Sequence, residues 1–317
     1  MGIPSLRFAA RWTWFIVGWA CCCLGVGCGR REPSALTVYA SQDQVYAEPL
    51  LKRFTERTGI AVHAIYDSEM VKTVGLVNRL LAEREQPLAD LYWSNEEFRT
   101  RQLAAEGIFR ETNGWISFGR RSRQWVMQTQ TLSQAPAVEV PKSLLELTNR
   151  NWRGKVALAS PLFGSTATHF AVLRQHWGEA VWKQWCIDLH RNQPILTEGN
   201  SMVVRLVARG QAVLGLTDSD DVAAGRREGW PVVGLSLGED AWQMPNTVAV
   251  IRGRPRSLQA QQLMEFLSSA ESQTFLQAAA ALESNSGQDG EPPGIDWEAL
   301  RRDLPSTTVF LRSVFLR

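Results

Sequence analysis

Three aspartates lie within four positions of one another, directly after a short apolar run. Residues 212–216, AVLGL, have the pattern of a buried strand, and Asp218, Asp220 and Asp221 follow it. Carboxylates held this close together repel one another and raise one another's pKa unless a positive group lies between them. The cluster therefore predicts a cationic guest, either a hard metal ion or a ligand ammonium group. The alternative is a solvated turn in which Asp220 or Asp221 caps the following helix.

Acidic and amide side chains also follow three strands predicted earlier in the chain. These strands cover residues 35–41, 60–67 and 88–94, and each ends in a polar loop. The candidate ligand residues on these loops are Gln42, Asp43 and Gln44, then Glu69, and finally Asn95 and Glu96. The alternative for each loop is capping of the next helix or an exposed helix start.

Two predicted helix starts offer the opposite chemistry. The sequence GSTAT at 164–168 brings Ser165 and Thr166 to the first turn of a helix, and GNS at 199–201 does the same with Asn200. Free backbone amides at such a position bind anions. One arginine of GRRSR, residues 119–123, would add to this site if it faces inward. Ordinary capping and surface charge are the alternatives.

The elements that must position these residues alternate along the chain. Strands and helices follow one another over residues 35–94 and again over 155–216, and a later strand at 245–253 precedes a helix at 257–280. This order predicts parallel sheets with helical crossovers. Two such α/β units, followed by a C-terminal segment that returns to the first unit, predict two lobes. Ligands of open α/β sheets bind beyond the carboxyl ends of the strands, so the candidate residues are expected to line a cleft between the lobes.

The N-terminal segment is predicted to be an export signal. Arg7 and Arg11 precede an uncharged, mostly apolar run of residues 12–26, which is shorter than the ~20 residues of a spanning helix. The sequence LGVGC resembles a lipoprotein processing site, so residues 1–27 are expected to be removed, with Cys28 lipidated and residues 28–34 forming a tether. An uncleaved anchor and a soluble secreted form remain alternatives. Only Cys186 lies beyond this segment, among large apolar residues, which predicts an inert core thiol and no disulfide.

Composition and motifs exclude several functions. The formal net charge of +2 is due to Arg7 and Arg11, so the rest of the chain is neutral and nothing in it indicates a nucleic-acid partner. The four histidines are scattered, with no His-x-x-x-His spacing that would indicate a zinc enzyme. The chain also lacks a phosphate-binding loop ending in Gly-Lys-Ser/Thr.

Taken together, these segments make the chain resemble bacterial periplasmic solute-binding proteins of ABC importers, in the class that contains the ferric-ion binding proteins. The resemblance runs from about residue 36 to about residue 281, and is carried by LTVYASQDQVYAEPLLKRFTERTGIAV, PLADLYWSNE, ISFGRRSR, LLELTNRNWRGKVALASPLFGSTATH, TEGNSMVVRLVARGQAVLGLTDSDD and PNTVAVI. It implies an α/β, two-lobed periplasmic-binding-protein fold (type II) with the ligand cleft between the lobes. The first lobe would take residues 35–125 plus 249–317, and the second 126–248.

The resemblance also implies positions for the ligand site. Iron-binding members commonly hold the ion with two adjacent tyrosines, and this pair aligns with Asp220 and Asp221. A third tyrosine ligand of some family members aligns near Ser165 of this chain. Their first-lobe histidine or tyrosine ligand aligns with Asp43 or Gln44, and their first-lobe glutamate ligand aligns with Asn95, beside Glu96. The metal ligands implied in this way are Asp43, Glu96, Asp220 and Asp221, so that carboxylates take the place of phenolates in an all-oxygen site.

The leading hypothesis is therefore a non-catalytic, monomeric receptor without a catalytic cofactor. It would capture ferric iron or another small cation, with a synergistic anion, and deliver it to a permease and its ATPase, which are separate chains. Its place would be the periplasm or the cell surface, with a lipid anchor in the membrane. The alternative ligands are zwitterions or organic cations, such as an aminophosphonate, thiamine or a polyamine. The rival hypothesis is a secreted hydrolase with Glu96 and Asp220 as general acid and base. A third possibility is a binding protein that signals to a sensor protein instead of delivering its ligand to a permease.

Overall fold

The computed structural model describes residues 35–66, 72–112, 114–133, 139–283 and 294–316. The predicted export signal, the tether, Cys28 and Glu69 lie outside these residues. Residues 34–317 form one compact unit. Within the described residues, no helix combines the length and the apolar character needed to cross a membrane.

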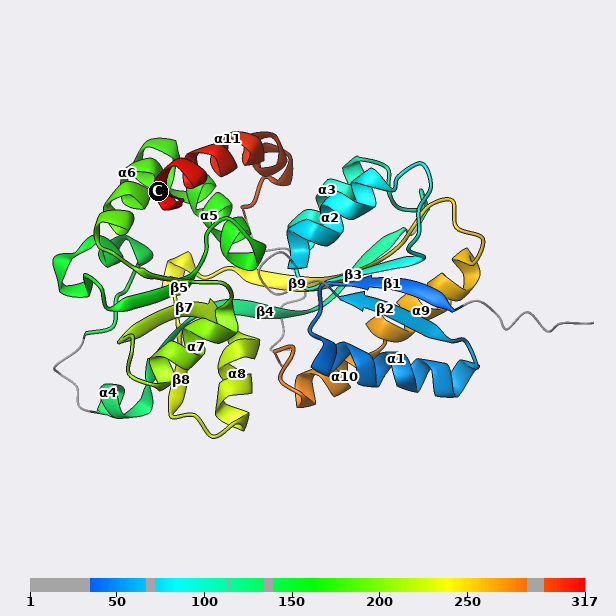
Figure 1. Cartoon of the computed structure of the whole chain (residues 1–317), viewed down its shortest axis with the longest axis horizontal. Coiled ribbons are helices and arrows are strands. Elements are labelled where there is room, and N and C mark those ends of the chain that lie inside the picture. Colours follow the sequence, from blue (N-terminus) through cyan, green and yellow to red (C-terminus); the bar gives the residue numbers. More distant parts are fainter. Residues whose placement is uncertain (1–34, 67–71, 113, 134–138, 284–293, 317) are drawn as a thin grey trace, which may run out of the picture. The chain divides into compact units, whose positions relative to one another are not determined.

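The strands form a nine-stranded sheet in the order β2-β1-β3-β9-β4-β7-β5-β6, with β8 paired to β4 (Figure 1). The pairs β1–β2, β1–β3, β5–β6 and β5–β7 are parallel, and the pairs of β4 with β7, β8 and β9 and of β3 with β9 are antiparallel. The strands are β1 (Leu36–Ala40), β2 (Val62–Tyr66), β3 (Leu91–Ser94), β4 (Trp115–Gln128), β5 (Val156–Ala159), β6 (Ile195–Thr197), β7 (Leu214–Asp218), β8 (Val232–Ser236) and β9 (Gln243–Val250).

The helices alternate with these strands. They are α1 (Gln44–Thr58), α2 (Lys72–Ala82), α3 (Glu97–Ala105), α4 (Thr129–Ser133), α5 (Gly164–Trp177), α6 (Glu179–Arg191), α7 (Asn200–Ala208), α8 (Ser219–Arg227), α9 (Ser257–Ser268), α10 (Ala270–Ala278) and α11 (Trp297–Phe315), with short 3-10 turns at Leu144–Thr148, Arg150–Trp152 and Gly238–Asp240. The helix predicted over 257–280 is two helices, because Ser269 has an extended backbone and caps α10.

The long strand β4 belongs to both halves of the sheet. Its residues up to Ser122 pair with β9, and those from Arg123 onward pair with β7. We call the half with β1, β2, β3 and β9 the first lobe and the half with β5, β6, β7 and β8 the second lobe. The change of partner follows a β-bulge between Phe118 and Arg120, where Gly119 has a φ of 53°. A side chain at Gly119 would also meet Leu282 at 2.4 Å, so both backbone and space favour glycine there.

Each lobe has apolar clusters on both faces of its sheet. In the first lobe, α1, α9 and α10 cover one face of the sheet and α2 and α3 the other (Figure 1). Alternate residues of β1 are buried in the clusters on these two faces. In the second lobe, Trp125 and Met127 face α5 and α6, whereas Val126 faces α7 and α8. Cys186 is buried in the first of these second-lobe clusters, and burial raises the pKa of its thiol. Cys186 is therefore a core residue, as predicted.

The C-terminal helix corrects the lobe assignment made from the sequence. Residues 249–317 were expected in the first lobe, but Leu311, Val314 and Phe315 of α11 are buried in the second-lobe cluster beside α5 and α6. The amphipathic helix finds its apolar partner there, although α9 and α10 do pack on the first lobe. The expected boundaries at 125/126 and 248/249 also lie within strands, β4 and β9, and β4 pairs with strands of both lobes.

Candidate functional site

A pocket of about 60 Å³ lies where loops from both lobes meet. Its walls come from the ends of β1, β3, β5, β6 and β7 and from the side of β4, as the rule for α/β sheets leads one to expect. The lining residues are Asp43, Asn95, Arg121, Ala159, Ser160, Phe163, Gly164, Ser165, Thr166, Glu198, Gly199, Asn200, Asp218 and Asp221. Seven of the residues singled out from the sequence are therefore brought together: Asp43, Asn95, Ser165, Thr166, Asn200, Asp218 and Asp221.

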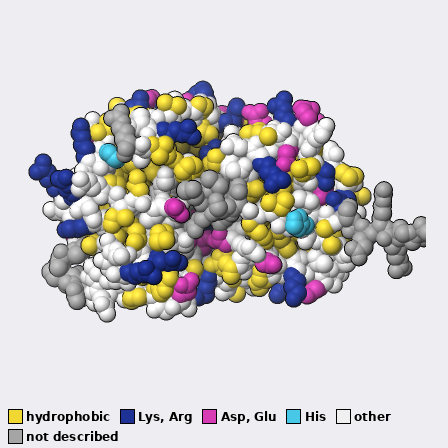
Figure 2. All heavy atoms as spheres, in the orientation of Figure 1, with side chains coloured by type: hydrophobic (Ala, Val, Ile, Leu, Met, Phe, Trp, Pro, Cys, Tyr) yellow, Lys and Arg dark blue, Asp and Glu magenta, His cyan; other side chains and the backbone are white. Residues whose placement is uncertain are grey.

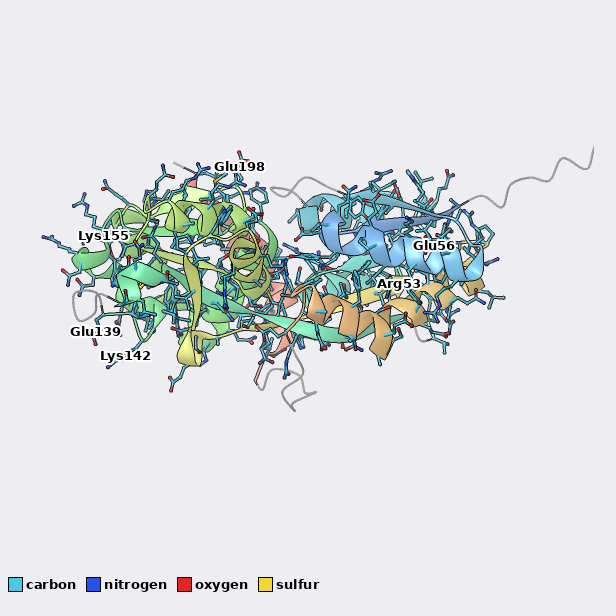
Figure 3. All side chains as sticks on the ribbon, turned by 90° about the horizontal axis from the view of Figure 1, so that it is seen from below. Arg53, Glu56, Glu139, Lys142, Lys155 and Glu198 are labelled. Atoms are coloured by element: carbon cyan, nitrogen blue, oxygen red, sulfur yellow. The ribbon has the colours of Figure 1, made fainter. Side chains whose placement is uncertain are left out.

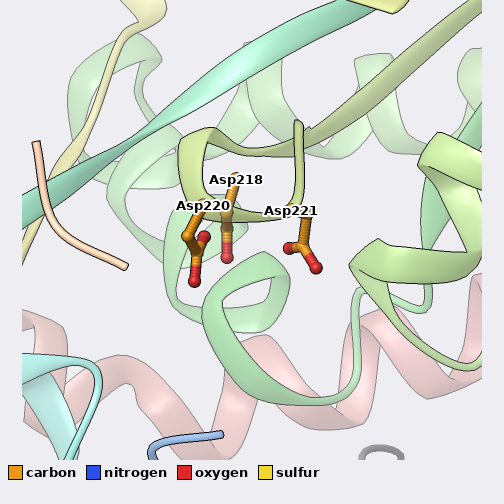
Figure 4. A group of neighbouring side chains, drawn as sticks. All are labelled: Asp218, Asp220 and Asp221. Carbon is orange, nitrogen blue, oxygen red and sulfur yellow. The ribbon is translucent and has the colours of Figure 1, made fainter. Parts of the chain in front are cut away.

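The three aspartates lie at the turn from β7 to α8. Asp218 is the last residue of β7, and Asp220 and Asp221 are in the first turn of α8. Their carboxylates point to the same side of this turn (Figure 4), with oxygens within 4.8 Å of one another. Asp218 and Asp220 are buried, and Asp221 is half-buried.

Two arginines of β4 neutralise these aspartates. Arg123 is the register partner of Asp218, so the two side chains share one face of the sheet, and strand alternation places Arg121 on that face as well. Arg123 Nη1 donates to Asp218 Oδ1 at 2.5 Å. Arg121 Nη1 lies 3.0 Å from Asp218 Oδ2 and donates to both oxygens of Asp220, at 3.0 and 2.9 Å.

These ion pairs correct the prediction that the cluster needs a cationic guest, because the compensating charge is built into β4. Burial works to raise the pKa of Asp218, but Arg121 and Arg123 more than offset it, and the pKa is lowered. Burial raises the pKa of Asp220 to about 6 against the pull of Arg121. Burial, Asp220 and Asp218 raise that of Asp221 well above its ordinary value. The two buried carboxylates of Asp218 and Asp220 thus face the two guanidinium groups of Arg121 and Arg123.

The opposite wall of the pocket consists of two helix starts. Phe163 and Gly199 precede α5 and α7 and provide no side-chain cap, so the first amides of both helices are not satisfied in this way. Ser165 Oγ donates to Asp218 at 2.8 Å, and Asn200 Nδ2 donates to Ser165 Oγ at 3.1 Å. Thr166 Oγ1 is buried and has no hydrogen-bond partner among the described residues.

Three of the predicted first-lobe residues do not line the pocket. Gln42 is buried, whereas Gln44 is exposed and donates to Glu48 Oε2 at 2.9 Å. Glu96 is fully buried and caps α3, because its Oε2 accepts a hydrogen bond from the Phe98 amide at 2.8 Å. Burial raises the pKa of Glu96 to about 7. Glu96 therefore has the capping role that was the alternative, and its absence from the pocket lining gives no support to the predicted roles as metal ligand and general acid.

Several residues at the site were missed or undervalued. Arg121 and Arg123 were seen only as part of a basic run with one inward member, although their two-residue spacing on a strand is the signal that both share a face. Glu198, on the loop before α7, is exposed at the pocket and projects from the second lobe (Figure 3). Across the face seen in Figure 2, acidic and basic side chains are interspersed without a large field of one sign.

Comparison with protein families decides the class. The model of the bacterial extracellular solute-binding proteins matches residues 36–279. The chain belongs to this family. Its members are binding proteins that work with ABC transporters, so the prediction of a non-enzymatic, extracytoplasmic solute-binding protein is confirmed, and the hydrolase alternative is set aside.

Known relatives and solved structures agree with this assignment. An uncharacterized protein of Haemophilus influenzae is 26% identical over 238 residues, 66% of this chain and 65% of that protein, so the chain spans just under two thirds of its length. The major ferric iron-binding protein of Neisseria meningitidis is 24% identical over 78% of this chain and 79% of its own.

Two solved structures confirm the fold. Iron-bound HitA from Pseudomonas aeruginosa has a TM-score of 0.75 at 19% identity, covering 89% of this chain and all of its own. AfuA from Actinobacillus pleuropneumoniae, solved with exogenous fructose-6-phosphate bound, has a TM-score of 0.75 at 17% identity, over 89% of this chain and 98% of its own. The predicted α/β periplasmic-binding-protein fold is therefore confirmed.

Proposed function

We propose that this solute-binding protein captures a small organic molecule that carries an anionic group, such as phosphate or carboxylate, beside hydroxyl or ammonium groups. It delivers this molecule to a permease and its ATPase, which are separate chains. The pocket supports this ligand class because one of its walls offers hydrogen-bond donors and the other offers acceptors. The zwitterionic alternative drawn from the sequence, exemplified by an aminophosphonate, falls within this class.

The anionic group is assigned to the start of α5. Uncapped amides there offer donors, and the helix dipole favours negative charge. The buried hydroxyl of Thr166 is a further donor that has no protein partner among the described residues. A ligand oxygen would satisfy this hydroxyl, which otherwise costs about 1–3 kcal/mol of desolvation.

The observation that carries the proposal is the position of Arg121. Arg121 lines the pocket, and its guanidinium already gives Asp220 two hydrogen bonds. A bare cation bound by Asp220 would have to compete with this resident charge. An anionic group can instead share the guanidinium, since arginine has five donors.

Hydroxyl or ammonium groups of the ligand are assigned to two carboxyl side chains of the pocket. Asp221 and Asp43 line the pocket from opposite lobes and are both half-buried. A bound ammonium group would lower the pKa of Asp221 and ionise it, whereas a hydroxyl would bind either form.

Ferric iron is the second candidate. Three aspartate oxygens that lie within 4.8 Å of one another favour it, as does the relationship to proteins named for ferric iron. In that case Asp220, Asp221 and Asp43 would be the protein ligands and a synergistic anion would contact the start of α5. Glu96 would not take part.

Thermal unfolding with a panel of ligands tests the proposal. The panel is fructose 6-phosphate, 2-aminoethylphosphonate, inorganic phosphate, ferric citrate and ferric nitrilotriacetate. A ligand at 100 times its Kd stabilises the protein by about 2.7 kcal/mol, or ~5 °C in Tm. We expect an organic phosphonate or phosphate to give this shift without iron, and Thr166→Val to reduce it. A shift only with ferric compounds, accompanied by colour, would establish the second candidate instead.

We further propose that Cys28 is lipidated and holds the protein at the outer face of the membrane. The basic residues, the apolar run and the cysteine of the N-terminal segment support this. Mass spectrometry of the N-terminal peptide from membrane fractions should show a lipid-modified Cys28, and Cys28→Ser should release the protein. An N-terminal peptide that retains residues 1–27 would contradict it.

A further inference from the structure

The helix α11 is anchored in the second lobe by its C-terminal half. Leu311, Val314 and Phe315 are buried in the apolar cluster formed with α5 and α6. Arg174 of α5 adds polar contacts, donating to Thr307 Oγ1 at 2.6 Å and to the Asp303 carbonyl at 3.3 Å. This half of the helix therefore belongs to the second lobe.

The N-terminal end of α11 contacts the first lobe. The Trp297 ring stacks on Phe98 of α3, with ring centroids 6.4 Å apart and an interplanar angle of 20°. The guanidinium of Arg101, also on α3, lies 4.7 Å from the centroid of the Trp297 ring. Leu300 completes a small apolar cluster with Phe98 and with Ala171 of α5. One helix thus joins α3 of the first lobe to α5 of the second.

Both helices joined in this way begin at the ligand pocket. Asn95 lines the pocket and lies three residues before Phe98, and Thr166 lines it and lies five residues before Ala171. Because a helix turn takes 3.6 residues, the contact with α11 lies within about two turns of the pocket on each side. A change in the distance between α3 and α5 would therefore alter the pocket directly.

The contact with α3 is small and separable from the cores of the lobes. A cavity of about 220 Å³ lies beside it, lined by residues of α3, by Trp115 and by Trp297. A second cavity of about 160 Å³ lies between α11 and α5. Few apolar contacts would be lost if α11 separated from α3, so this separation is expected to cost little free energy compared with the unfolding of either lobe.

We infer that α11 is a strap fixed to the second lobe, and that Trp297 is a positioning residue whose contact with α3 holds the lobes at the spacing that forms the ligand pocket. An aromatic pair of this kind contributes beyond its buried area, so its loss can shift a balance between two lobe arrangements. The effect on ligand affinity rests on the proposed function. The effect on lobe spacing does not.

Measurement of the distance between the lobes tests the strap directly. Spin labels are attached to Lys52→Cys on α1 and Arg191→Cys on α6, two exposed positions. The protein used is residues 29–317, which includes the whole compact unit and has Cys186, which is buried, as its single native cysteine. Double electron-electron resonance then compares the distribution of distances between the labels in Trp297→Ala with that in Val309→Ala, a change at an exposed position of the same helix. We expect Trp297→Ala to broaden the distribution toward longer distances and Val309→Ala to leave it unchanged.

Two further measurements complete the test. Circular dichroism verifies that the variants are folded, and Trp297→Leu replaces Trp297→Ala if the latter is not. Fructose 6-phosphate titration, or titration with whichever panel ligand shifts the wild-type Tm, should show affinity about tenfold weaker for Trp297→Ala and unchanged for Val309→Ala. An unchanged lobe distance in folded Trp297→Ala or Trp297→Leu overturns the strap. A wild-type protein that binds none of the organic anions counts against the proposed function alone.

Discussion

Replacement of Arg121 by methionine should destabilise the protein strongly, because it leaves the buried carboxylate of Asp220 without its charged partner. Asp220 is 4% exposed and receives both of its Arg121 hydrogen bonds from one nitrogen, which also lies 3.0 Å from Asp218 Oδ2. Removal of one member of a buried ion pair costs about 3–5 kcal/mol. Methionine keeps most of the side-chain length, so the loss is mainly electrostatic. We therefore expect Arg121→Met to lower the free energy of unfolding by about 3–5 kcal/mol at pH 8.

The pH dependence of this loss identifies its cause. Asp220 has a folded pKa of about 6, above its ordinary value of 3.8. An acid whose pKa is higher in the folded state destabilises the fold as the pH rises from the ordinary pKa through the folded one. Loss of Arg121 raises the folded pKa further and extends this destabilisation to higher pH. The deficit of Arg121→Met should therefore be larger at pH 8 than at pH 5.

Urea unfolding of single and double variants measures these effects. Arg121→Met combined with Asp220→Asn should recover most of the lost stability, because the uncompensated charge is gone. Arg302→Met is the matched control, since its side chain is 71% exposed and its contact with Asp303 is at the surface. Such a change is expected within about 0.5 kcal/mol of the wild type. An Arg121→Met protein as stable as the control at pH 8, or one that Asp220→Asn fails to rescue, would refute the assignment of Arg121 as the compensating charge.

Three other substitutions give expected outcomes. Thr166→Val should leave the free energy of unfolding unchanged or slightly increased, since its hydroxyl has no partner among the described residues, while it weakens ligand binding in calorimetry. The wild type should lose about 3 kcal/mol of stability between pH 4.5 and 7, because the pKa of Glu96 rises from 4.5 to about 7 on folding. Glu96→Gln should abolish this loss, and parallel slopes of stability against pH in the two proteins would contradict the reasoning. Gly119→Ala should cost about 1–3 kcal/mol in thermal unfolding, since φ is 53° and Leu282 lies 2.4 Å from the added carbon, whereas Gly154→Ala, with positive φ but open space, should cost less.

Local patterns were sufficient to predict most of the elements and the loops that line the pocket. The alternation of β1 and the helical spacing of α1 and α7 follow from their own residues. Asp43, Asn95 and Asn200 could be placed at the pocket because strand ends in one α/β sheet converge, without knowledge of any long-range contact.

What the sequence could not show depends on pairing between distant segments. The neutralisation of the aspartates follows from the register of β4 against β7, which brings Arg123 beside Asp218 across 95 positions of the chain. The position of α11 likewise depends on which lobe offers its apolar face a partner. Glu96 was ambiguous for another reason, because a carboxylate at a helix start has the same local pattern whether it binds a ligand or caps the helix.

The ion pairs of β4 also constrain how this protein would hold iron. A ferric ion at Asp220 and Asp221 must take the oxygens of Asp220 that Arg121 already occupies, and it would leave a buried guanidinium beside a trivalent charge. An anion that accompanies the metal removes this conflict, because its oxygens can accept from Arg121 and from the start of α5 while its other groups hold the ion. Iron would therefore enter as a complex with an anionic chelator, and the anion, not the metal, would make the contacts that this pocket is built to offer. Ferric citrate should then bind far more tightly than ferric ion supplied with a weak anion, and iron-free citrate should compete with it for the same site.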